Sequence, residues 1–511
     1  MGKQTHSHLE RLRKRTAPIE MDPEEFRELG YQVVDMISDF IGSLPDKPVN
    51  RSDSPSAVQT MLGQGTLPDS GTPPGEIVSE MAELLFDHSL FNGHPRFWGY
   101  ITSSAAPIGA LADLLAAAIN PNVGGWILSP VATEIEKQTV SWIAQLLGYP
   151  PDCGGLLVSG GNVSNFVGFL AARQAKLDWN VRKNGMGDQG RGRPRVYCSA
   201  DTHTWIEKAS DQYGLGTDAV RWIETDDNYQ INLTSLEEQI KKDLGNGDSP
   251  FLVVGTAGTV AVGAVDDLPA IAEILREFDL WFHVDGAYGG FAACLPDASV
   301  EIKGLKYADS IATDPHKWLY SPLEAGCAMV RNPQLLLDTF SYHPTYYKFE
   351  EIDKEAPVNY YEYGPQNSRG FRALKVWMGL KQVGRQGYID MISDDIQLAQ
   401  RLYSLVEGNE NLEAITQNLS ITTFRYKPTN HEGDSATLES YLNKLNEELL
   451  TRLQSSGEAF LSNAVIGGKF CLRACIVNFR TSLSDIEALP EIIARIGGEV
   501  DLAMRQEDET L

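Results

Sequence analysis

Short apolar runs that alternate with helical patterns restrict the folds open to the middle of this chain. The runs have the length of strands and end in small or polar residues; they are 155–158, 196–199, 251–256, 281–284 and 310–313. Strands that alternate with helices indicate βαβ crossovers and a parallel sheet. Ligands bind beyond the carboxyl ends of such strands. We therefore expect an α/β fold with its functional residues at the strand ends.

The pattern divides the chain into three predicted parts. Residues 1–95 are expected to form a helical arm, in which 22–25 (Asp-Pro-Glu-Glu) is a helix start signal and 43–75 is a connector rich in Pro, Ser, Asp and Gly. Residues 96–385 are expected to form a large α/β domain. Residues 386–511 are expected to form a small α+β domain. A chain of 511 residues exceeds the roughly 100 to 200 typical of one domain.

Charge and cysteine content argue against several kinds of partner. Lys and Arg number 43 against 69 Asp and Glu, and the net charge of -26 would repel nucleic acid and anionic lipid. The 6 cysteines form no Cys-x-x-Cys pair, which predicts no metal site and reduced thiols in the cytoplasm. The most apolar stretch, 105–119, contains Asp113 and is shorter than the roughly 20 residues of a membrane span. No membrane segment is expected.

Two strand ends carry residues that predict a specific chemistry. Lys317 follows one of them, among small and aromatic residues, where an amine removed from water can attack a carbonyl cofactor. Asp285 ends another strand, and a carboxylate there could keep the pyridine nitrogen of pyridoxal 5'-phosphate protonated. A single strand-end lysine is more often a surface residue, and Asp285 alone could be a helix cap or a metal ligand. Their occurrence together favours the cofactor.

Two further strand ends add to this pattern. In the segment 159–165, backbone N–H groups and a helix N-terminus could bind a phosphate, although Gly-Gly turns are common. His203 follows another strand, and its ring could stack on a cofactor and exchange protons near neutral pH. The order of phosphate turn, histidine, aspartate and lysine along one sheet predicts a pyridoxal-phosphate site.

Motifs in the same order continue over most of the chain, from about residue 22 to 505. They are His94-Pro95-Arg96-Phe97, Ser129-Pro130-Val131-Ala132-Thr133-Glu134, Gly255-Thr256-Ala257-Gly258-Thr259, His283-Val284-Asp285-Gly286-Ala287-Tyr288, Pro315-His316-Lys317-Trp318 and Phe371-Arg372-Ala373-Leu374-Lys375. The sequence resembles the group II pyridoxal-phosphate decarboxylases of fold type I, and among them the aromatic-L-amino-acid decarboxylases. This resemblance implies a mainly parallel seven-stranded sheet and a homodimer with shared active sites, in which residues 1–95 pack on the partner.

The resemblance also assigns roles to residues around the cofactor. It implies that Lys317 holds pyridoxal 5'-phosphate, that Asp285 pairs with its ring nitrogen and that His203 stacks on its ring. The other implied cofactor contacts are Gly160, Gly161 and Asn162 at the phosphate, together with Thr256 or Thr259, Ala287 and His316. Asp314 departs from the family pattern, because family members commonly carry Asn at this place.

The implied reaction is decarboxylation of an aromatic L-amino acid (tryptophan, tyrosine, phenylalanine or dopa) to its amine and CO2. Tyr346 would donate the proton that completes it, and relatives with Phe at this place form aldehydes instead. The substrate pocket is predicted from aromatic and small residues, with 122–126 supplied by the partner: Trp98, Tyr100, Ile101, Ser103, Gly124, Trp126 and Ser368. Gly124 would widen the pocket toward indole, whereas Ser368 could bind a phenol. A glutamate-type decarboxylase and a fold type I aminotransferase remain alternatives.

Overall fold

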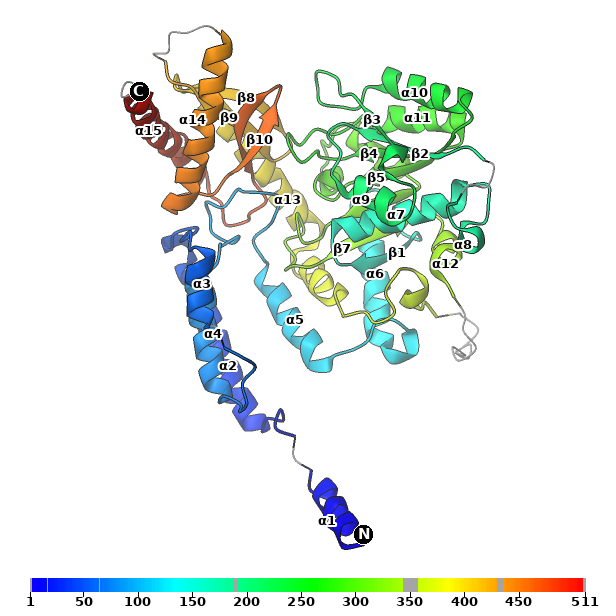
Figure 1. The fold of residues 1–511 in the computed structure, drawn as a ribbon, viewed down its shortest axis with the longest axis vertical. Helices are drawn as coiled ribbons and strands as arrows, with labels where there is room; N and C mark the ends of the chain where they lie inside the picture. Colours follow the sequence, from blue (N-terminus) through cyan, green and yellow to red (C-terminus); the bar gives the residue numbers. More distant parts are fainter. Residues whose placement is uncertain are drawn as a thin grey trace. The chain divides into compact units, whose positions relative to one another are not determined.

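The computed structural model describes residues 2–15, 17–63, 65–187, 191–342, 357–429 and 435–508. The chain divides into two compact units, Met1–Phe91 and Asn92–Leu511, and Figure 1 shows the helices and strands of each. The division lies close to the predicted end of the arm at residue 95.

The first unit is helical. It consists of α1 (Gly2–Arg13), α2 (Pro23–Ser43), the 3-10 helix η1 (Leu44–Asp46), α3 (Pro55–Leu62) and α4 (Pro74–His88). The start signal is confirmed, because Asp22 caps α2 and its side chain accepts a hydrogen bond from the backbone N–H of Glu24 at 2.9 Å. Phe40 of α2 stacks on Phe86 of α4 with ring centroids 4.5 Å apart. None of the residues of α2, α3 or α4 is fully buried, so these described helices have no core of their own.

A seven-stranded sheet forms the centre of the second unit. The strands are β1 (Gly154–Val158), β2 (Pro194–Ser199), β3 (Val220–Ile223), β4 (Ser249–Thr256), β5 (Trp281–Asp285), β6 (Ser310–Thr313) and β7 (Gly326–Val330). Their order is β1-β7-β6-β5-β4-β2-β3, and only β7 runs antiparallel to its neighbours. The predicted α/β fold with a mainly parallel sheet is confirmed. The apolar runs did not reveal β3, in which the central residues Arg221 and Trp222 are not fully buried, or β7, which begins with small residues.

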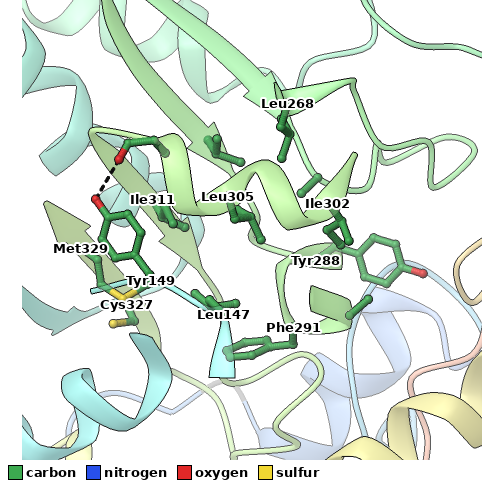
Figure 2. Packing of buried hydrophobic residues seen from close by; sticks show 14 of the residues in the cluster. Leu147, Tyr149, Leu268, Tyr288, Phe291, Ile302, Leu305, Ile311, Cys327 and Met329 are labelled. Atoms are coloured by element: carbon green, nitrogen blue, oxygen red, sulfur yellow. Dashed lines mark hydrogen bonds between the residues drawn. The ribbon is translucent and has the colours of Figure 1, made fainter. Parts of the chain in front are cut away.

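Helices and apolar side chains cover both faces of this sheet. The α-helices are α5 (Pro107–Ile119), α6 (Pro130–Leu146), α7 (Gly161–Lys176), α8 (Val181–Asn184), α9 (Trp205–Gln212), α10 (Leu233–Gly245), α11 (Leu268–Phe278) and α12 (Gln334–Phe340). Short 3-10 helices are η2 (Trp126–Leu128), η3 (Thr217–Ala219), η4 (Gly289–Cys294), η5 (Ile302–Tyr307) and η6 (Tyr360–Glu362). On one face, Leu147, Phe291 and Ile311 belong to a large buried cluster (Figure 2).

Successive residues of β5 show how the sheet directs its side chains. Phe282 and Val284 join the cluster of Figure 2, whereas Trp281 joins the cluster on the opposite face, which includes Phe169 of α7. Because side chains alternate along a strand, Asp285 points to the same face as Trp281. The Asp285 carboxylate therefore emerges on the α7 side of the sheet.

A long helix and a second sheet complete this unit. The helix α13 (Ala373–Glu407) has a non-helical backbone at Gly384, with φ 67° and ψ 171°. The four-stranded antiparallel sheet has the order β10-β11-β9-β8, built from β8 (Leu412–Asn418), β9 (Ile421–Tyr426), β10 (Ser462–Ile466) and β11 (Lys469–Cys475). The remaining helices are α14 (Ser435–Ser456) and α15 (Leu483–Asp508). A domain boundary at residue 385 stays a prediction, and it lies one residue beyond the irregular Gly384.

A buried carboxyl group on α13 holds the segment that follows Lys317. Asp395 Oδ2 accepts hydrogen bonds from Trp318 Nε1 at 2.8 Å and from the Tyr320 hydroxyl at 2.7 Å. Complete burial raises the pKa of Asp395 to about 7. The two donors fix the position of the carboxyl group, while its burial favours the protonated form.

We predict that Asp395 makes stability depend on pH between about 4 and 7. The pKa of Asp395 is raised in the folded state, so its carboxyl group takes up a proton on folding. The stabilisation from this protonated carboxyl group is present below pH ~4 and is lost as the pH rises to ~7. Between pH 5 and 7 the free energy of unfolding of the wild type should fall by roughly 2 kcal/mol relative to that of Asp395→Asn, because the asparagine does not titrate. Melting temperatures of both proteins at pH 5, 6, 7 and 8 measure this. A difference that stays constant over the range would show that Asp395 is already ionised in the folded protein.

Candidate active site

The carboxyl ends of several strands meet around a cavity of about 210 Å³. Its lining brings together residues predicted from separate parts of the sequence: Ile101, Gly161, Asn162, His203, Thr256, Asp285, Ala287, His316 and Lys317. It also contains residues to which we gave no cofactor or substrate role: Asn165, Asp201, Gly258, Val260, Tyr288 and Asp314. One cavity therefore combines an amine, several carboxylates and the start of a helix.

Lys317 lies in a turn directly after β6. Its Nζ is 3.1 Å from Asp314 Oδ2, and its side chain is 18% exposed. Ser103 does not line the cavity, but its hydroxyl donates to the backbone oxygen of His316 at 2.7 Å. Ser103 thus holds the lysine segment in place, which differs from the predicted contact with substrate. Burial lowers the pKa of the neighbouring His316, with Asp314 acting in the opposite direction.

Asp285 lies at the end of β5, and only 7% of its surface is exposed. Its Oδ2 accepts a hydrogen bond from Trp205 Nε1 at 2.7 Å, and its Oδ1 accepts one from the backbone N–H of Ala287 at 3.1 Å. Since each oxygen has a donor, the orientation of the carboxylate plane is fixed before any ligand binds.

His203 follows β2 and lines the same cavity. Partial removal from water lowers its pKa, Asp285 opposes this shift and Lys317 adds to it. The backbone N–H of Trp205 lies 3.2 Å from His203 Nδ1, so in the neutral ring Nδ1 accepts and Nε2 carries the proton. The lowered pKa favours this neutral form near pH 7.

The start of α7 forms the predicted phosphate turn. Gly160 has φ 103° and ψ 178°, a conformation suited to glycine, and no side chain caps the helix. A Cβ atom at Gly161 would come 2.8 Å from Asp314 Oδ2, so a side chain there would crowd the turn. Uncapped N–H groups at a helix start favour an anion. Gly161 and Asn162 line the cavity, whereas Gly160 shapes the turn without lining it.

Two buried polar atoms beside the cavity also fit a bound cofactor. Within the described part of the chain, Thr256 Oγ1 and Asp314 Oδ1 have no hydrogen-bond partner. Unpaired buried polar atoms are uncommon in folded proteins and call for an explanation. A phosphorylated pyridine aldehyde fits a site with an uncapped helix start, an oriented carboxylate and an amine.

Two predicted site residues lie outside the cavity lining. Thr259 is 1% exposed, and its Oγ1 accepts a hydrogen bond from the N–H of Ala264 at 3.1 Å, so of the two threonines left open only Thr256 lines the cavity. Trp98 is fully buried in a cluster with residues of α13, α14 and α15, and its Nε1 donates to Thr481 Oγ1 at 3.0 Å. Trp98 is therefore a core residue in this structure and does not line the cavity.

The other predicted pocket residues lie outside this cavity. The side chain of Asn122 accepts hydrogen bonds from the N–H groups of Gly124 and Arg369, at 3.0 and 3.1 Å. A Cβ atom at Gly124 would overlap the carbonyl oxygen of Asn367. Glycine is thus needed for close backbone approach at this position, a reason that the sequence did not reveal.

The remaining predictions, for the substrate pocket and for Tyr346, stay untested. Trp126 Nε1 donates to Glu134 at 2.9 Å, and Tyr100 and Ser368 are exposed. Tyr346 lies outside the described residues. The substrate roles of these residues and of Gly124 remain predictions.

Comparison with known proteins identifies the family. Residues 59–427 match the family model described as the pyridoxal-dependent decarboxylase conserved domain. The chain is 33% identical to an aromatic-L-amino-acid decarboxylase of Bacillus atrophaeus, over 95% of this chain and 98% of the relative. It is 28% identical to a phenylacetaldehyde synthase of a Rosa hybrid cultivar, over 92% and 93%.

A solved structure agrees with this family. The crystal structure of Oryza sativa TDC with PLP and tryptamine superposes with a TM-score of 0.87 at 28% identity, covering 95% of this chain and 99% of that one. The chain belongs to the pyridoxal-dependent decarboxylase family. The predictions of fold type, of pyridoxal 5'-phosphate as cofactor and of a carboxy-lyase activity are thereby confirmed. In the described part of the chain, no helix is long and apolar enough to span a membrane.

Proposed function

We propose that this enzyme removes CO2 from an aromatic L-amino acid and releases the amine. The observation that carries this proposal is the composition of the cavity lining. Among its described residues, Lys317 is the only lysine or arginine, while Ile101, Val260 and Tyr288 add apolar and aromatic surface. A second carboxylate, as in glutamate, would find no free cation here, whereas a flat ring suits such a surface.

Arg473 bears on the aminotransferase alternative. Its Nε and Nη2 donate to Ser462 Oγ at 3.1 and 2.8 Å, and its Nη1 donates to the backbone oxygen of Val260. The guanidinium group is thus engaged within the fold and does not line the cavity. The described structure therefore offers no support for Arg473 as a substrate carboxylate site, the role of an arginine in many fold type I aminotransferases.

The side chains of the cavity suit the tasks of a decarboxylase. When bound, pyridoxal 5'-phosphate supplies a protonated ring that accepts the electron pair left when CO2 departs. Lys317 would provide the amine for the cofactor aldehyde, and Asp285 would hold the proton on the ring nitrogen. His203 would lie against the ring. The N–H groups at the start of α7 would bind the phosphate.

We expect activity on aromatic amino acids and little on glutamate. CO2 release and amine formation should be measured with tryptophan, tyrosine, phenylalanine, dopa and glutamate, together with keto acid as a test for transamination. Because the lining has no free cation for a second carboxylate, the best aromatic substrate should exceed glutamate by ~100-fold or more in kcat/KM. Activity on glutamate alone, or keto acid without CO2, would contradict the proposal.

Tyr346 is proposed as the acid that selects the amine product. The relatives of this chain include decarboxylases and aldehyde synthases, so membership of the family leaves the product open. After CO2 leaves, the substrate Cα must receive a proton before it reacts with oxygen. A tyrosine hydroxyl can supply that proton, whereas a phenylalanine ring cannot.

Changing Tyr346 to Phe should convert the enzyme toward aldehyde formation. Amine formation should fall by ~100-fold or more, the usual scale of a general-acid contribution. The amino acid, O2 and water would then give aldehyde, CO2, ammonia and hydrogen peroxide. Amine and peroxide should be measured together, with Tyr342→Phe as the control, because Tyr342 lies on the exposed surface against Arg182. An unchanged amine yield without peroxide in Tyr346→Phe would exclude this role.

A homodimer with shared active sites is also proposed. The helix α5 leaves four large apolar side chains at least half exposed: Leu111, Leu114, Leu115 and Ile119. Both α5 and α6 pack on α13, and Val131 at the start of α6 is 73% exposed. Apolar surface of this kind is typical of protein interfaces. Light scattering of the active enzyme should give twice the chain mass, and a stable, active monomer would contradict the proposal.

A cytoplasmic location is proposed from the cysteines. All six are free in the structure, and all except Cys153 are buried. Reduced cysteines are typical of cytosolic proteins.

A further inference from the structure

Trp205 connects two residues of the proposed cofactor site. It is the first residue of α9 and is fully buried. Its indole N–H donates to Asp285 Oδ2 at 2.7 Å, and its backbone N–H points to His203 Nδ1 at 3.2 Å. The side chain thus holds the carboxylate, while the backbone of the same residue holds the ring that lines the cavity.

The side chains that pack behind Trp205, namely His283, Ser310 and Asn165, are uncharged. The Trp205 ring meets the His283 ring edge-on, with centroids 5.6 Å apart and an interplanar angle of 77°. His283 Nδ1 lies 2.7 Å from Ser310 Oγ, and its Nε2 lies 2.7 Å from Asn165 Oδ1. Complete burial lowers the pKa of His283 to about 4, so the ring is neutral at working pH. His283 therefore carries no positive charge that could pair with the Asp285 carboxylate.

These side chains extend to the start of α7, the proposed phosphate-binding end of the cavity. Asn165 Nδ2 donates to the backbone oxygen of Gly161 at 2.9 Å, at the start of α7. Hydrogen bonds and ring contacts thus run from Asp285 through Trp205, His283 and Asn165 to Gly161. Both ends of the cavity are supported by one buried set of uncharged side chains.

We propose that Trp205 is a positioning residue that fixes the plane of the Asp285 carboxylate for the cofactor ring nitrogen. The last torsion of an aspartate side chain has a broad energy profile, so hydrogen bonds at its oxygens decide the orientation. Among the described residues, Trp205 is the side chain that donates to Asp285, and the other donor is the backbone N–H of Ala287. This inference rests on the proposed role of Asp285.

Removal of the indole N–H would have two consequences. Asp285 Oδ2 is buried, so the loss of its donor would leave a charged oxygen without that bond, which is costlier than the loss of a neutral pair. The carboxylate would also be free to turn away from the ring nitrogen. The first effect lowers the stability of the protein. The second weakens cofactor binding through Asp285 alone, and this distinguishes a positioning role from simple packing.

A double-mutant cycle on cofactor affinity tests the proposal. The dissociation constant of pyridoxal 5'-phosphate is measured by spectral titration of the apoenzyme for wild type, Trp205→Phe, Asp285→Ala and the double variant. Trp205→Phe should weaken binding by ~10-fold or more in the wild-type background, on the scale of hydrogen bonds to charged groups. In the Asp285→Ala background the same change should have less than a ~3-fold effect.

The control is a tryptophan that makes a similar bond elsewhere. Trp377 Nε1 donates to Gln138 Oε1 at 2.7 Å at an exposed site outside the cavity, so Trp377→Phe should leave the dissociation constant unchanged. If Trp205→Phe does not fold, benzothienylalanine at position 205 keeps the shape of indole, replaces N–H by sulfur and should give the same loss of affinity.

The outcomes separate this inference from the proposed role of Asp285. An equal loss of affinity from Trp205→Phe in both backgrounds, or no loss at all, would overturn the positioning role and leave Asp285 in place. An unchanged affinity in Asp285→Ala alone would overturn the role of Asp285 and the present inference with it.

Discussion

The common direction of the strands is the constraint on which the site depends. Strands β2, β3, β4, β5 and β6 run parallel to one another, so their carboxyl ends reach one edge of the sheet. Asp285 ends β5, and Lys317 follows β6 by four residues. Residues that are distant in sequence therefore share one cavity. The antiparallel β7 lies between β1 and β6 and does not interrupt this edge.

The site also depends on the hydrogen bonds and ion pairs that hold its charged side chains. Asp285 is held by donors at both oxygens, and Asp314 lies beside the Lys317 amine. A fully buried pair, Glu136 and Arg369, joins β1 to the segment at Val123, because Arg369 also donates to the backbone oxygens of Leu157 and Val123 at 2.6 and 3.0 Å. Breaking a buried pair of this kind costs about 3 to 5 kcal/mol. Hydrogen bonds and paired charges thus hold the charged side chains of the cavity and connect β1 to the segment at Val123.

The sequence predicted the features that depend on local pattern. Apolar runs located five of the seven strands, and the residues after them gave Lys317, Asp285, His203 and the glycine turn, which share the cavity or shape it. The sequence did not reveal contacts between residues that are far apart in the chain. Trp98 was predicted in the substrate pocket, and the structure shows its hydrogen bond to Thr481, which lies 383 residues away. Trp205 stands two residues after His203 and had no assigned role, since its contact with Asp285 spans 80 residues. No local signal indicates such contacts.

We propose that Lys317 carries the cofactor at the edge where these strands meet. The most direct test is to treat the holoenzyme with borohydride, digest it and locate the phosphopyridoxyl group by mass spectrometry. We expect this group on Lys317, with the other lysines unmodified. A group found on another lysine while Lys317 remains free would contradict this proposal.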